Sequence, residues 1–453
     1  MSAGSVRAVV LAAGKGTRMK SARPKVLHDL CGRPMLWWIL RTLRDAGVGD
    51  VTVVANGDLA PHIAGVAESA GHASVRAVLQ EPQRGTGHAV QVALAGLEAG
   101  GGTLLVLNGD MPLVDVELVQ STLDARDGAL ALVTARMPLP SSFGRIVRDG
   151  AHVSRIVEAR DATDDELRVD EMNAGVYAYD EAKLRAVATE LGNDNAQNEY
   201  YLTDTISTLM KRGERVVPVV APDYRSVLGV NDRVELAAAA ALLNARICDL
   251  HMRAGVTIVD PARTYLEPDL VLAADVTLLP NTTLARGTQV GAHSDIGPNV
   301  RLHNARVGEH AVVTDSVVVD SSIGDFAIVG PYAHVRAQSD IGTGTQIGNF
   351  VETKQAVLAP GVKARHLAYL GDAAIGERTN IGAGTITCNF DGVDKHRTTI
   401  GKDAFIGSNS SLVAPLDIGD RALTGAGSVV IRDVASGDRV AGNPARVLPP
   451  KKS

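Results

Sequence analysis

The first half of the chain alternates short apolar runs with longer amphipathic segments. The apolar runs, each closed by turn residues, cover residues 6–11, 51–55, 103–107 and 129–134. Amphipathic segments of helical length lie between them, for example at residues 35–46 and 88–99. This alternation predicts a mostly parallel sheet covered by helices. Ligands of such sheets bind beyond the carboxyl ends of the strands.

The second half repeats with a period of six. Aliphatic residues or threonines recur at this step in five runs, often with glycine directly after them: Val290, Ile296 and Leu302; Val307, Val313 and Val319; Val329, Val335, Ile341, Ile347 and Thr353; Ile375, Ile381 and Thr387; and Ile400, Ile406, Leu412, Ile418, Thr424 and Val430. A period of two suits a strand and one of about 3.6 suits a helix, so six suits neither alone. It predicts a parallel β-helix that turns a corner every six residues and points these side chains inward. The step breaks between Thr387 and Ile400, where we expect an extruded loop over residues 388–397.

The two patterns are separated by residues 232–253, which are rich in strong helix formers. Either Asn231 or Asp232 is suited to cap the start of this helix, and Gly255 is suited to end it. At about 1.5 Å per residue the helix is about 30 Å long, so we interpret it as a rigid arm. The sequence therefore predicts an α/β domain over residues 1–231, a helical linker over 232–254, and a β-helix domain over 255–453.

The composition of the chain bears on the type of core, on nucleic-acid and membrane binding, and on the cellular compartment. Of 453 residues, 45% are hydrophobic but only 3% aromatic, so the cores must be aliphatic, and the repeats explain the 46 glycines. A net charge of −6 gives no argument for nucleic-acid binding. We expect no signal peptide and no membrane insertion, because no apolar stretch is long enough. Cys31, Cys248 and Cys388 fit neither a disulfide framework nor a metal spacing, so we expect a cytoplasmic protein.

Positive charge is concentrated directly after the first apolar run. Gly14 and Gly16 allow a tight turn there, and five cations follow within eleven residues: Lys15, Arg18, Lys20, Arg23 and Lys25. This concentration suggests a polyanion, most simply a nucleoside triphosphate, although a solvated basic loop is the alternative. The P-loop motif is absent, and so is a complete dinucleotide fingerprint.

A second signal follows the apolar run at 103–107, where the sequence reads Asn108-Gly109-Asp110. An acid directly after a buried strand can hold Mg²⁺ against a triphosphate. The alternative is that these residues are only turn chemistry. The basic loop on the same predicted sheet edge favours the metal.

The string from Leu11 to Met19, with Pro24 and Lys25 downstream, resembles the signature of sugar-1-phosphate nucleotidylyltransferases, which have a Rossmann-like domain. Further strings resemble family segments in the family's order, at residues 80–89, 143–145, 156–158, 173–175, 198–204 and 229–231. The resemblance implies nucleotide and sugar contacts at Leu11, Ala12, Ala13, Gly14, Lys25, Gln80, Gly85, Thr86, Asn108, Gly109, Asp110, Gly144, Glu158, Asn173 and Asn231.

The resemblance also implies roles for these residues. Arg18 and Lys25 offset the charge that develops on phosphate, and Asp110 and Asn231 hold Mg²⁺. Uracil faces Gln80, Gly85 and Thr86, while the sugar faces Gly144, Glu158 and Asn173. Close relatives often carry an aromatic or small residue at the position of Asn108, so this chain departs from them there.

The six-residue repeats resemble the left-handed β-helix of the acyltransferase superfamily, which is trimeric. Around them the chain is similar to bifunctional N-acetylglucosamine-1-phosphate uridylyltransferases and glucosamine-1-phosphate acetyltransferases. The resemblance implies His366 as general base, Arg336 and Lys354 on the sugar phosphate, and Tyr369 and Asn380 on the sugar. It implies acetyl-CoA contacts at Ala383, Asn389, Phe390, Ser408, Ala426 and Arg446. From spacing alone, we expect Glu352 to orient His366.

Two departures concern the coenzyme A end of this site. Phe390 stands where the family has a tyrosine, and the ending at residues 440–446 resembles generic hexapeptide acetyltransferases, so Arg446 is expected to substitute there. The resemblance implies acetylation of glucosamine-1-phosphate, then transfer from UTP to N-acetylglucosamine-1-phosphate, in a homotrimer. One alternative is a nucleotidylyltransferase whose β-helix only oligomerises. Another is a scaffold without activity, against which Arg18, Lys25 and Asp110 argue.

Overall fold

The computed structural model describes residues 5–150 and 152–449. These residues form two compact units that meet between Ala240 and Ala241 in the sequence.

The first unit is built around a nine-stranded sheet. Its strands are β1 (Val6–Leu11), β4 (Asp50–Ala55), β5 (Arg76–Leu79), β6 (Thr103–Asn108), β7 (Leu130–Arg136), β8 (Arg145–Asp149), β9 (His152–Val157), β10 (Glu171–Asp180) and β11 (Val216–Val220). The order is β11-β7-β10-β6-β1-β4-β5, and the hairpin β8–β9 joins β10. β1 is parallel to both β4 and β6, whereas β10 runs antiparallel to β6 and β7. The predicted sheet is therefore present, with β10 as an antiparallel insertion.

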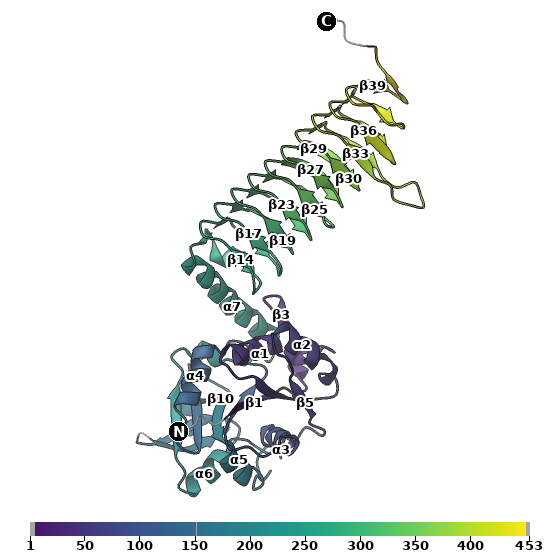
Figure 1. Cartoon of the computed structure of the whole chain (residues 1–453). Helices are drawn as coiled ribbons and strands as arrows, with labels where there is room; N and C mark the ends of the chain where they lie inside the picture. Colours follow the sequence, from purple (N-terminus) through teal and green to yellow (C-terminus); the bar gives the residue numbers. More distant parts are fainter. Residues whose placement is uncertain (1–4, 151, 450–453) are drawn as a thin grey trace. The chain divides into compact units, whose positions relative to one another are not determined.

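Helices cover both faces of this sheet (Figure 1). They are α1 (Met35–Asp45), α2 (Ile63–Ser69), α3 (Thr86–Gly96), α4 (Val116–Asp124), α5 (Glu181–Ala188) and α6 (Asp204–Lys211). Successive side chains of β1 point to opposite faces, because the strand period is two. Val10 belongs to a core with residues of α1, α2 and α4, and Val9 to a core with residues of α3, α5 and α6. Both cores are mainly aliphatic, as the composition predicted.

The predicted linker helix is α7 (Arg233–Arg253). Asp232 caps its start, since Asp232 Oδ1 accepts hydrogen bonds from the backbone of Val234 and Glu235 at 2.8 and 2.9 Å. Glu235 Oε2 in turn accepts one from the Asn231 backbone at 2.6 Å. Gly255, with φ of +97°, ends the helix as expected. Because the boundary between the units falls within α7, the division at 231 and 254 stays a prediction.

The second unit is a β-helix of three parallel ladders (Figure 1). The first ladder contains β12 (Thr257–Ile258), β15 (Thr277–Leu278), β18 (Asp295–Ile296), β21 (Val312–Val313), β24 (Ile328–Val329), β27 (Gln346–Lys354), β29 (Lys363–Gly371), β31 (Asn380–Ile381), β34 (Phe405–Ile406), β37 (Leu423–Thr424) and β39 (Arg439–Gly442). The second contains β13 (Thr264–Leu266), β16 (Thr282–Leu284), β19 (Arg301–His303), β22 (Val317–Val319), β25 (His334–Arg336), again β27 and β29, β32 (Ile386–Cys388), β35 (Ser411–Val413) and β38 (Val429–Val430). The third contains β14 (Val271–Leu272), β17 (Gln289–Val290), β20 (Arg306–Val307), β23 (Ser322–Ile323), β26 (Asp340–Ile341), β28 (Val357–Leu358), β30 (Ala373–Ile375), β33 (Thr398–Ile400) and β36 (Leu416–Ile418).

The inward positions that the six-residue step predicts are buried in these ladders, except at one residue. Ile296 pairs with Val313, and both are buried, so one turn takes about three hexapeptides. Val319 was expected inside but is only half-buried, and Val318 takes the inward place. Five residues rather than six separate Val313 from Val318, so the corner between them is one residue shorter. β40 (Ala445–Val447) pairs antiparallel with β39 near the end.

The expected loop interrupts this regular stacking. Ile381 pairs with Ile406, so this turn is longer than its neighbours. Within it Phe390 forms an antiparallel bridge with Lys395, and the His396 backbone N–H donates to Asn389 O at 2.8 Å. The loop extends from the side of the ladders as a small hairpin (Figure 1).

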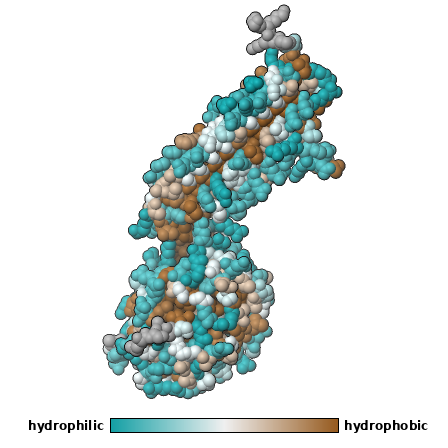
Figure 2. Space-filling view, in the orientation of Figure 1, coloured by the Kyte–Doolittle hydropathy of each residue, from teal (hydrophilic) through white to brown (hydrophobic). Residues whose placement is uncertain are grey.

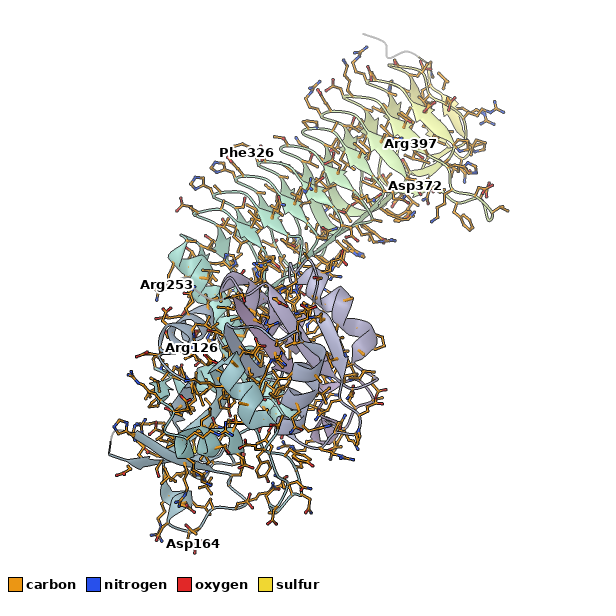
Figure 3. The ribbon with its side chains drawn as sticks, turned by 60° about the horizontal axis from the view of Figure 1, so that its bottom comes forward. Arg126, Asp164, Arg253, Phe326, Asp372 and Arg397 are labelled. Carbon is orange, nitrogen blue, oxygen red and sulfur yellow. The ribbon has the colours of Figure 1, made fainter. Side chains whose placement is uncertain are left out.

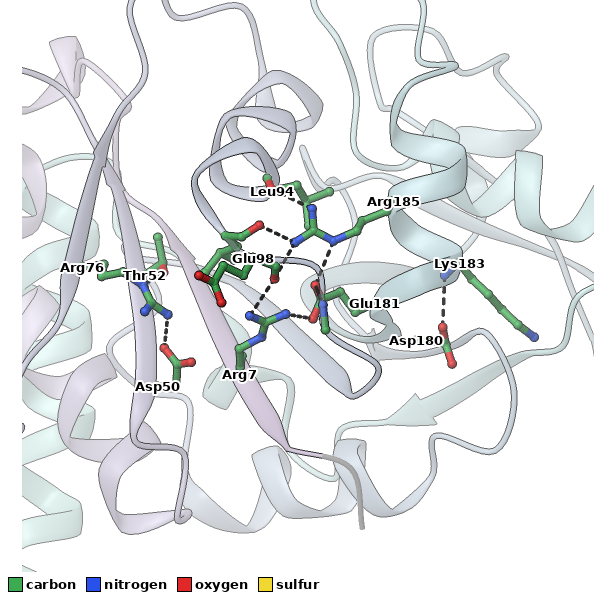
Figure 4. A network of polar contacts seen from close by, with 12 residues as sticks. Arg7, Asp50, Thr52, Arg76, Leu94, Glu98, Asp180, Glu181, Lys183 and Arg185 are labelled. Atoms are coloured by element: carbon green, nitrogen blue, oxygen red, sulfur yellow. Dashed lines mark hydrogen bonds and ion pairs between the residues drawn. The ribbon is translucent and has the colours of Figure 1, made fainter. Parts of the chain in front are cut away.

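A buried ion cluster ties β1 of the first unit to α5 (Figure 4). The fully buried carboxylate of Glu181 accepts hydrogen bonds from Arg7, from Arg185 Nε at 2.9 Å and from the Gly100 backbone at 3.1 Å. Burial by itself raises the pKa of Glu181, but the bonds from Arg7 and Arg185 outweigh it and lower the pKa below 4.5. The charged form is therefore the one that stabilises the fold.

We predict that Glu181→Gln lowers the free energy of unfolding of the first unit at pH 7 by about 2–3 kcal/mol, because two guanidinium groups lose their charged hydrogen-bond partner. A lowered pKa gives stability above the ordinary pKa of the carboxyl, which is lost as the pH falls through the lowered value. The difference between wild type and variant should thus shrink below about pH 4.5. Urea unfolding followed by circular dichroism measures it. A difference that stays constant with pH contradicts the role of the charge.

Candidate functional site

The basic loop leaves the carboxyl end of β1 and is held against the sheet. The Ala12 backbone N–H donates to Val54 O at 2.8 Å, and Gly109 N–H donates to Leu11 O at 2.8 Å. Gly16 has φ of +59°, and a Cβ there would lie 2.6 Å from Lys25 Cβ. Only glycine lets the loop pass this close to Lys25, which begins the short 3₁₀ helix η2 (Lys25–Leu27).

Two cavities adjoin at this edge of the sheet. The larger, of about 620 Å³, is lined by residues 11–18, Lys25, Val26, Gln80, Gln83, Gly85, Thr86, Ala89, Asn108, Asp110, Glu199 and Asn231. The smaller, of about 280 Å³, is lined by Leu11, Thr86, Asn108, Asp110, Met111, residues 142–144, Glu158, residues 173–175, Tyr177, Leu202, Thr203, Gly229 and Asn231. Every residue that we predicted to contact nucleotide or sugar lines one of them, except Gly109. Gly109 lies behind the wall, where a Cβ would be 3.0 Å from that of Ala12.

The two cavities share the side chains of Asp110 and Asn231, and Lys25 lies between these. The ammonium of Lys25 forms an ion pair with Asp110 and lies 3.2 Å from Asn231 Oδ1. The Val230 backbone donates to Asp110 O at 2.8 Å, and the cap of α7 fixes the Asn231 backbone. The side-chain oxygens of Asp110 and Asn231 thus converge on the Lys25 ammonium. Oxygen atoms of this kind are the ligands that Mg²⁺ prefers. No cluster of three or more His, Cys, Asp or Glu suited to a metal occurs among the described residues.

The smaller cavity has polar side chains in its wall, among them those of Glu158 and Asn173. Glu158 Oε1 accepts a hydrogen bond from Thr203 Oγ1 at 3.0 Å. Burial raises the pKa of Glu158, the Thr203 hydroxyl opposes this, and the nearby Asp204 and Asp161 add to the rise. Asn173 donates through its backbone to Gly144 O at 2.8 Å and through Nδ2 to the Tyr177 hydroxyl at 2.6 Å. Two side chains that can form hydrogen bonds with a ligand, Glu158 and Asn173, therefore line the same small cavity.

In the second unit, a cavity of about 370 Å³ is lined by Arg336, Lys354, Tyr369, Asn389, Phe390 and Lys395. Ladder register brings Arg336 beside Lys354, and Glu352 beside Tyr369. Lys354 Nζ lies 3.3 Å from Asp372 Oδ2, and Asn389 donates to the same carboxylate; Asp372 is labelled in Figure 3.

Lys395 is a cavity residue that our sequence reasoning missed. It lies on the extruded loop, and contact with the Lys354 ammonium lowers the pKa of Lys395. The break in the six-residue step was the available signal, because it predicted a loop over residues 388–397 without indicating which of its side chains return to the ladders.

His366 lies outside that cavity, on an exposed corner. Its Nδ1 is 3.1 Å from Asn349 Oδ1, because β27 and β29 pair Asn349 with His366. The expectation that Glu352 orients His366 is wrong. The same register places Glu352 three positions farther along, where Glu352 Oε1 accepts from Arg336 at 2.6 and 2.8 Å.

The remaining predicted residues of this unit do not line the described cavities. Asn380 is half-buried on β31, and Ala383, Ser408 and Ala426 lie at one corner of successive turns. Asn409 N–H donates to Ala383 O at 2.6 Å there, and Gly427 N–H donates to Ser408 O at 2.8 Å. Arg446 is exposed on β40.

Both units of the chain are similar to known protein families. Residues 8–158 match the MobA-like NTP transferase domain, and residues 397–432 match the hexapeptide repeat of succinyl-transferase. The bifunctional protein GlmU of Brevibacillus brevis is 45% identical over 95% of this chain and 93% of its own. This chain belongs to the GlmU family. The GlmU protein of Heliobacterium modesticaldum is 44% identical over 95% and 94% of the two chains, and that of Streptomyces avermitilis 42% over 95% and 90%.

Cys31, Cys248 and Cys388 of this GlmU family member form no disulfide, and burial raises the pKa of the Cys248 thiol to about 11. Within the part of the chain that the structure describes, no helix is both long enough and apolar enough to span a bilayer.

We predict that Thr203→Val raises the pKa of Glu158 further, because the hydroxyl that stabilises the carboxylate is lost while burial remains. Thr203→Ser keeps a hydroxyl and should leave the pKa of Glu158 close to that of the wild type. Titration of ¹³C-labelled glutamate carboxyls by NMR measures both variants. An unchanged Glu158 titration in Thr203→Val would show that the hydroxyl contributes nothing.

Proposed function

We propose that the two units catalyse successive steps that lead to UDP-N-acetylglucosamine. The chain is a bifunctional uridylyltransferase and acetyltransferase of the GlmU family. The second unit acetylates glucosamine-1-phosphate from acetyl-CoA, and the first joins the product to UTP and releases pyrophosphate. The observation that carries the first activity is the pair of adjoining cavities, one walled by the basic loop and one by Glu158 and Asn173.

In the first unit, UTP occupies the larger cavity and the sugar phosphate the smaller. A phosphate oxygen of N-acetylglucosamine-1-phosphate attacks the α-phosphorus of UTP, and pyrophosphate leaves in line. Arg18 and Lys25 line the triphosphate cavity and offset the charge that develops on the phosphate oxygens. The reacting atoms meet at the junction of the cavities, beside Asp110 and Asn231.

Asp110 and Asn231 are the residues that would hold Mg²⁺. The ion would supply charge neutralisation at the phosphates when bound. The same two side chains hold the Lys25 ammonium in this structure, so their oxygen atoms already accommodate a cation.

The residues of the smaller cavity select the sugar. Glu158 is held by Thr203 and accepts from sugar hydroxyls, and Asn173 and the Gly144 backbone add polar contacts. Gln80, Gly85 and Thr86, which line the larger cavity, receive the uracil ring.

In the second unit, the amine of glucosamine-1-phosphate attacks the thioester carbon of acetyl-CoA. The new C–N bond forms as the C–S bond breaks, coenzyme A leaves as thiolate, and His366 takes the proton lost by the amine. Asn349 Oδ1 accepts from Nδ1–H of His366, which leaves Nε2 as the basic atom. The phosphate binds Arg336 and Lys354 with Lys395. Tyr369 and Asn380 contact the sugar, and coenzyme A follows the corner of Ala383, Ser408 and Ala426 towards Asn389, Phe390 and Arg446.

The second unit is proposed to form a homotrimer. Large apolar side chains are exposed along it, among them Phe326, Tyr332, Phe350 and Leu367, each more than half exposed. Figure 2 shows a band of apolar residues along its visible face. Burying such a band between copies stabilises an assembly. Sedimentation velocity should give three times the mass of one chain, and a monomer would contradict it. UTP and acetyl-CoA as co-substrates support a cytoplasmic site of action.

We predict that His366→Ala lowers acetyl transfer by about 100-fold or more and leaves uridylyl transfer intact, because the general base serves one reaction only. Arg18→Ala should do the reverse, with about a 100-fold loss of uridylyl transfer. Radiolabelled acetyl-CoA and pyrophosphate release measure the two rates on the same preparations.

Chelation of divalent cations should lower uridylyl transfer and leave acetyl transfer intact, as Arg18→Ala does and His366→Ala does not. Equal loss of both activities in either variant would contradict the assignment of one reaction to each unit. A wild-type chain that releases pyrophosphate but transfers no acetyl group would favour the alternative, a nucleotidylyltransferase whose β-helix only assembles the protein.

A further inference from the structure

The amide group of Gln80 is held in one orientation at the wall of the larger cavity. Gln80 directly follows β5, it is only 4% exposed, and its backbone N–H donates to Ala55 O at 2.9 Å. Its side-chain Nε2 lies 2.9 Å from the carbonyl oxygen of Gly85 and 3.2 Å from Nδ1 of His88. The side chain therefore has two neighbours on its nitrogen side.

These two neighbours determine which end of the amide faces the cavity. A carbonyl oxygen can only accept a hydrogen bond, so the Gly85 oxygen requires the NH₂ end of Gln80 beside it. The second N–H of Gln80 then points at His88 Nδ1, which must carry a lone pair and leave the ring proton on Nε2. Burial and the charge of Arg84 lower the pKa of His88, which keeps this ring neutral.

The opposite end of the amide, Oε1, is left as an acceptor. No described residue donates a hydrogen bond to Gln80 Oε1, although Gln80 lines the cavity. His88 and the base-facing residues Gly85 and Thr86 belong to one turn at the start of α3. Gly85 has φ of +101°, and a Cβ there would lie 2.6 Å from Tyr200 O, so the backbone that carries the Gly85 carbonyl is closely confined.

We propose that His88 is a positioning residue for base selection, and that it holds Gln80 so that Oε1 accepts the N3–H of uracil. The proposal rests on the uridylyl transfer proposed above. Uracil carries a hydrogen on N3, whereas cytosine carries a lone pair there, which would oppose Oε1. A pyrimidine with a 5-methyl group keeps N3–H, so this arrangement does not distinguish it from uracil. The chemistry recognised is thus a pyrimidine with a hydrogen on N3.

The experiment compares steady-state kinetics with UTP, CTP and 5-methyl-UTP in the full-length chain. His88→Leu removes one of the two acceptors that hold the NH₂ end of Gln80, so the amide is held less firmly and the ratio of kcat/KM for UTP over CTP should fall about 10-fold. His88→Asn restores an acceptor at the position of Nδ1, and its ratio should stay within about 3-fold of the wild type. His88→Ala, which adds no bulk, is measured alongside in case the leucine disturbs folding.

Two further readouts separate positioning from a structural role. The ratio for UTP over 5-methyl-UTP should not change in any variant, because both bases carry N3–H. Acetyl transfer by the second unit should be unchanged and reports that the chain is intact.

The inference is overturned if the UTP-to-CTP ratio of His88→Leu and His88→Ala equals that of the wild type. It is also overturned if the kcat/KM values for UTP and for CTP fall by the same factor. Either result in an active wild-type background leaves the proposed function in place. A wild-type chain that releases no pyrophosphate from UTP would instead overturn the proposed function, and this inference with it.

Discussion

The contact of Lys25 with Asp110 and Asn231 is the interaction on which the first unit depends. Lys25 follows β1, Asp110 follows β6, and Asn231 precedes α7, so two side chains 85 and 206 residues away along the chain meet at the Lys25 ammonium. A partly buried carboxylate without its partner is costly. The contact therefore needs the parallel register of β1 and β6, the turn around Gly16 and the cap of α7 together. The two cavities adjoin at this same point, which brings the binding spaces for triphosphate and sugar phosphate to a common edge.

The second unit obeys a different constraint, which is the register between successive turns. Each outward side chain has as neighbour the residue one turn later, and a shift of one position moves it to the other face. Arg336 and Lys354 meet through this register, as do Asn349 and His366. The one long turn breaks the rule and returns Lys395 to the cavity beside Lys354. The chemistry of this unit is thus distributed along the ladders, and its cavity in a single chain is shallow and cationic.

Much of this architecture was predictable because it is local. The strand at residues 6–11, the start of α1 at Met35 and the ends of α7 match the structure closely. Each depends on a period of two or 3.6 residues, or on a cap, which neighbouring residues supply. The antiparallel direction of β10 was not predictable in this way, because β10 is buried along almost its whole length, as β6 and β7 are, and nothing in its sequence records the direction. Val319 was misplaced because a corner shortened by one residue leaves the aliphatic pattern almost unchanged.

The sequence by itself determined the strand and helix periods, the six-residue repeat, the residue types of both sites and, through its motifs, the family. It could not decide which side chains are partners. Asn349 rather than Glu352 beside His366, Thr203 beside Glu158, and His88 beside Gln80 all follow from pairings between distant segments. Hydrogen bonds act over about 3 Å, so their partners are known only when strands, turns and helices have been placed in register. That placement belongs to the tertiary structure.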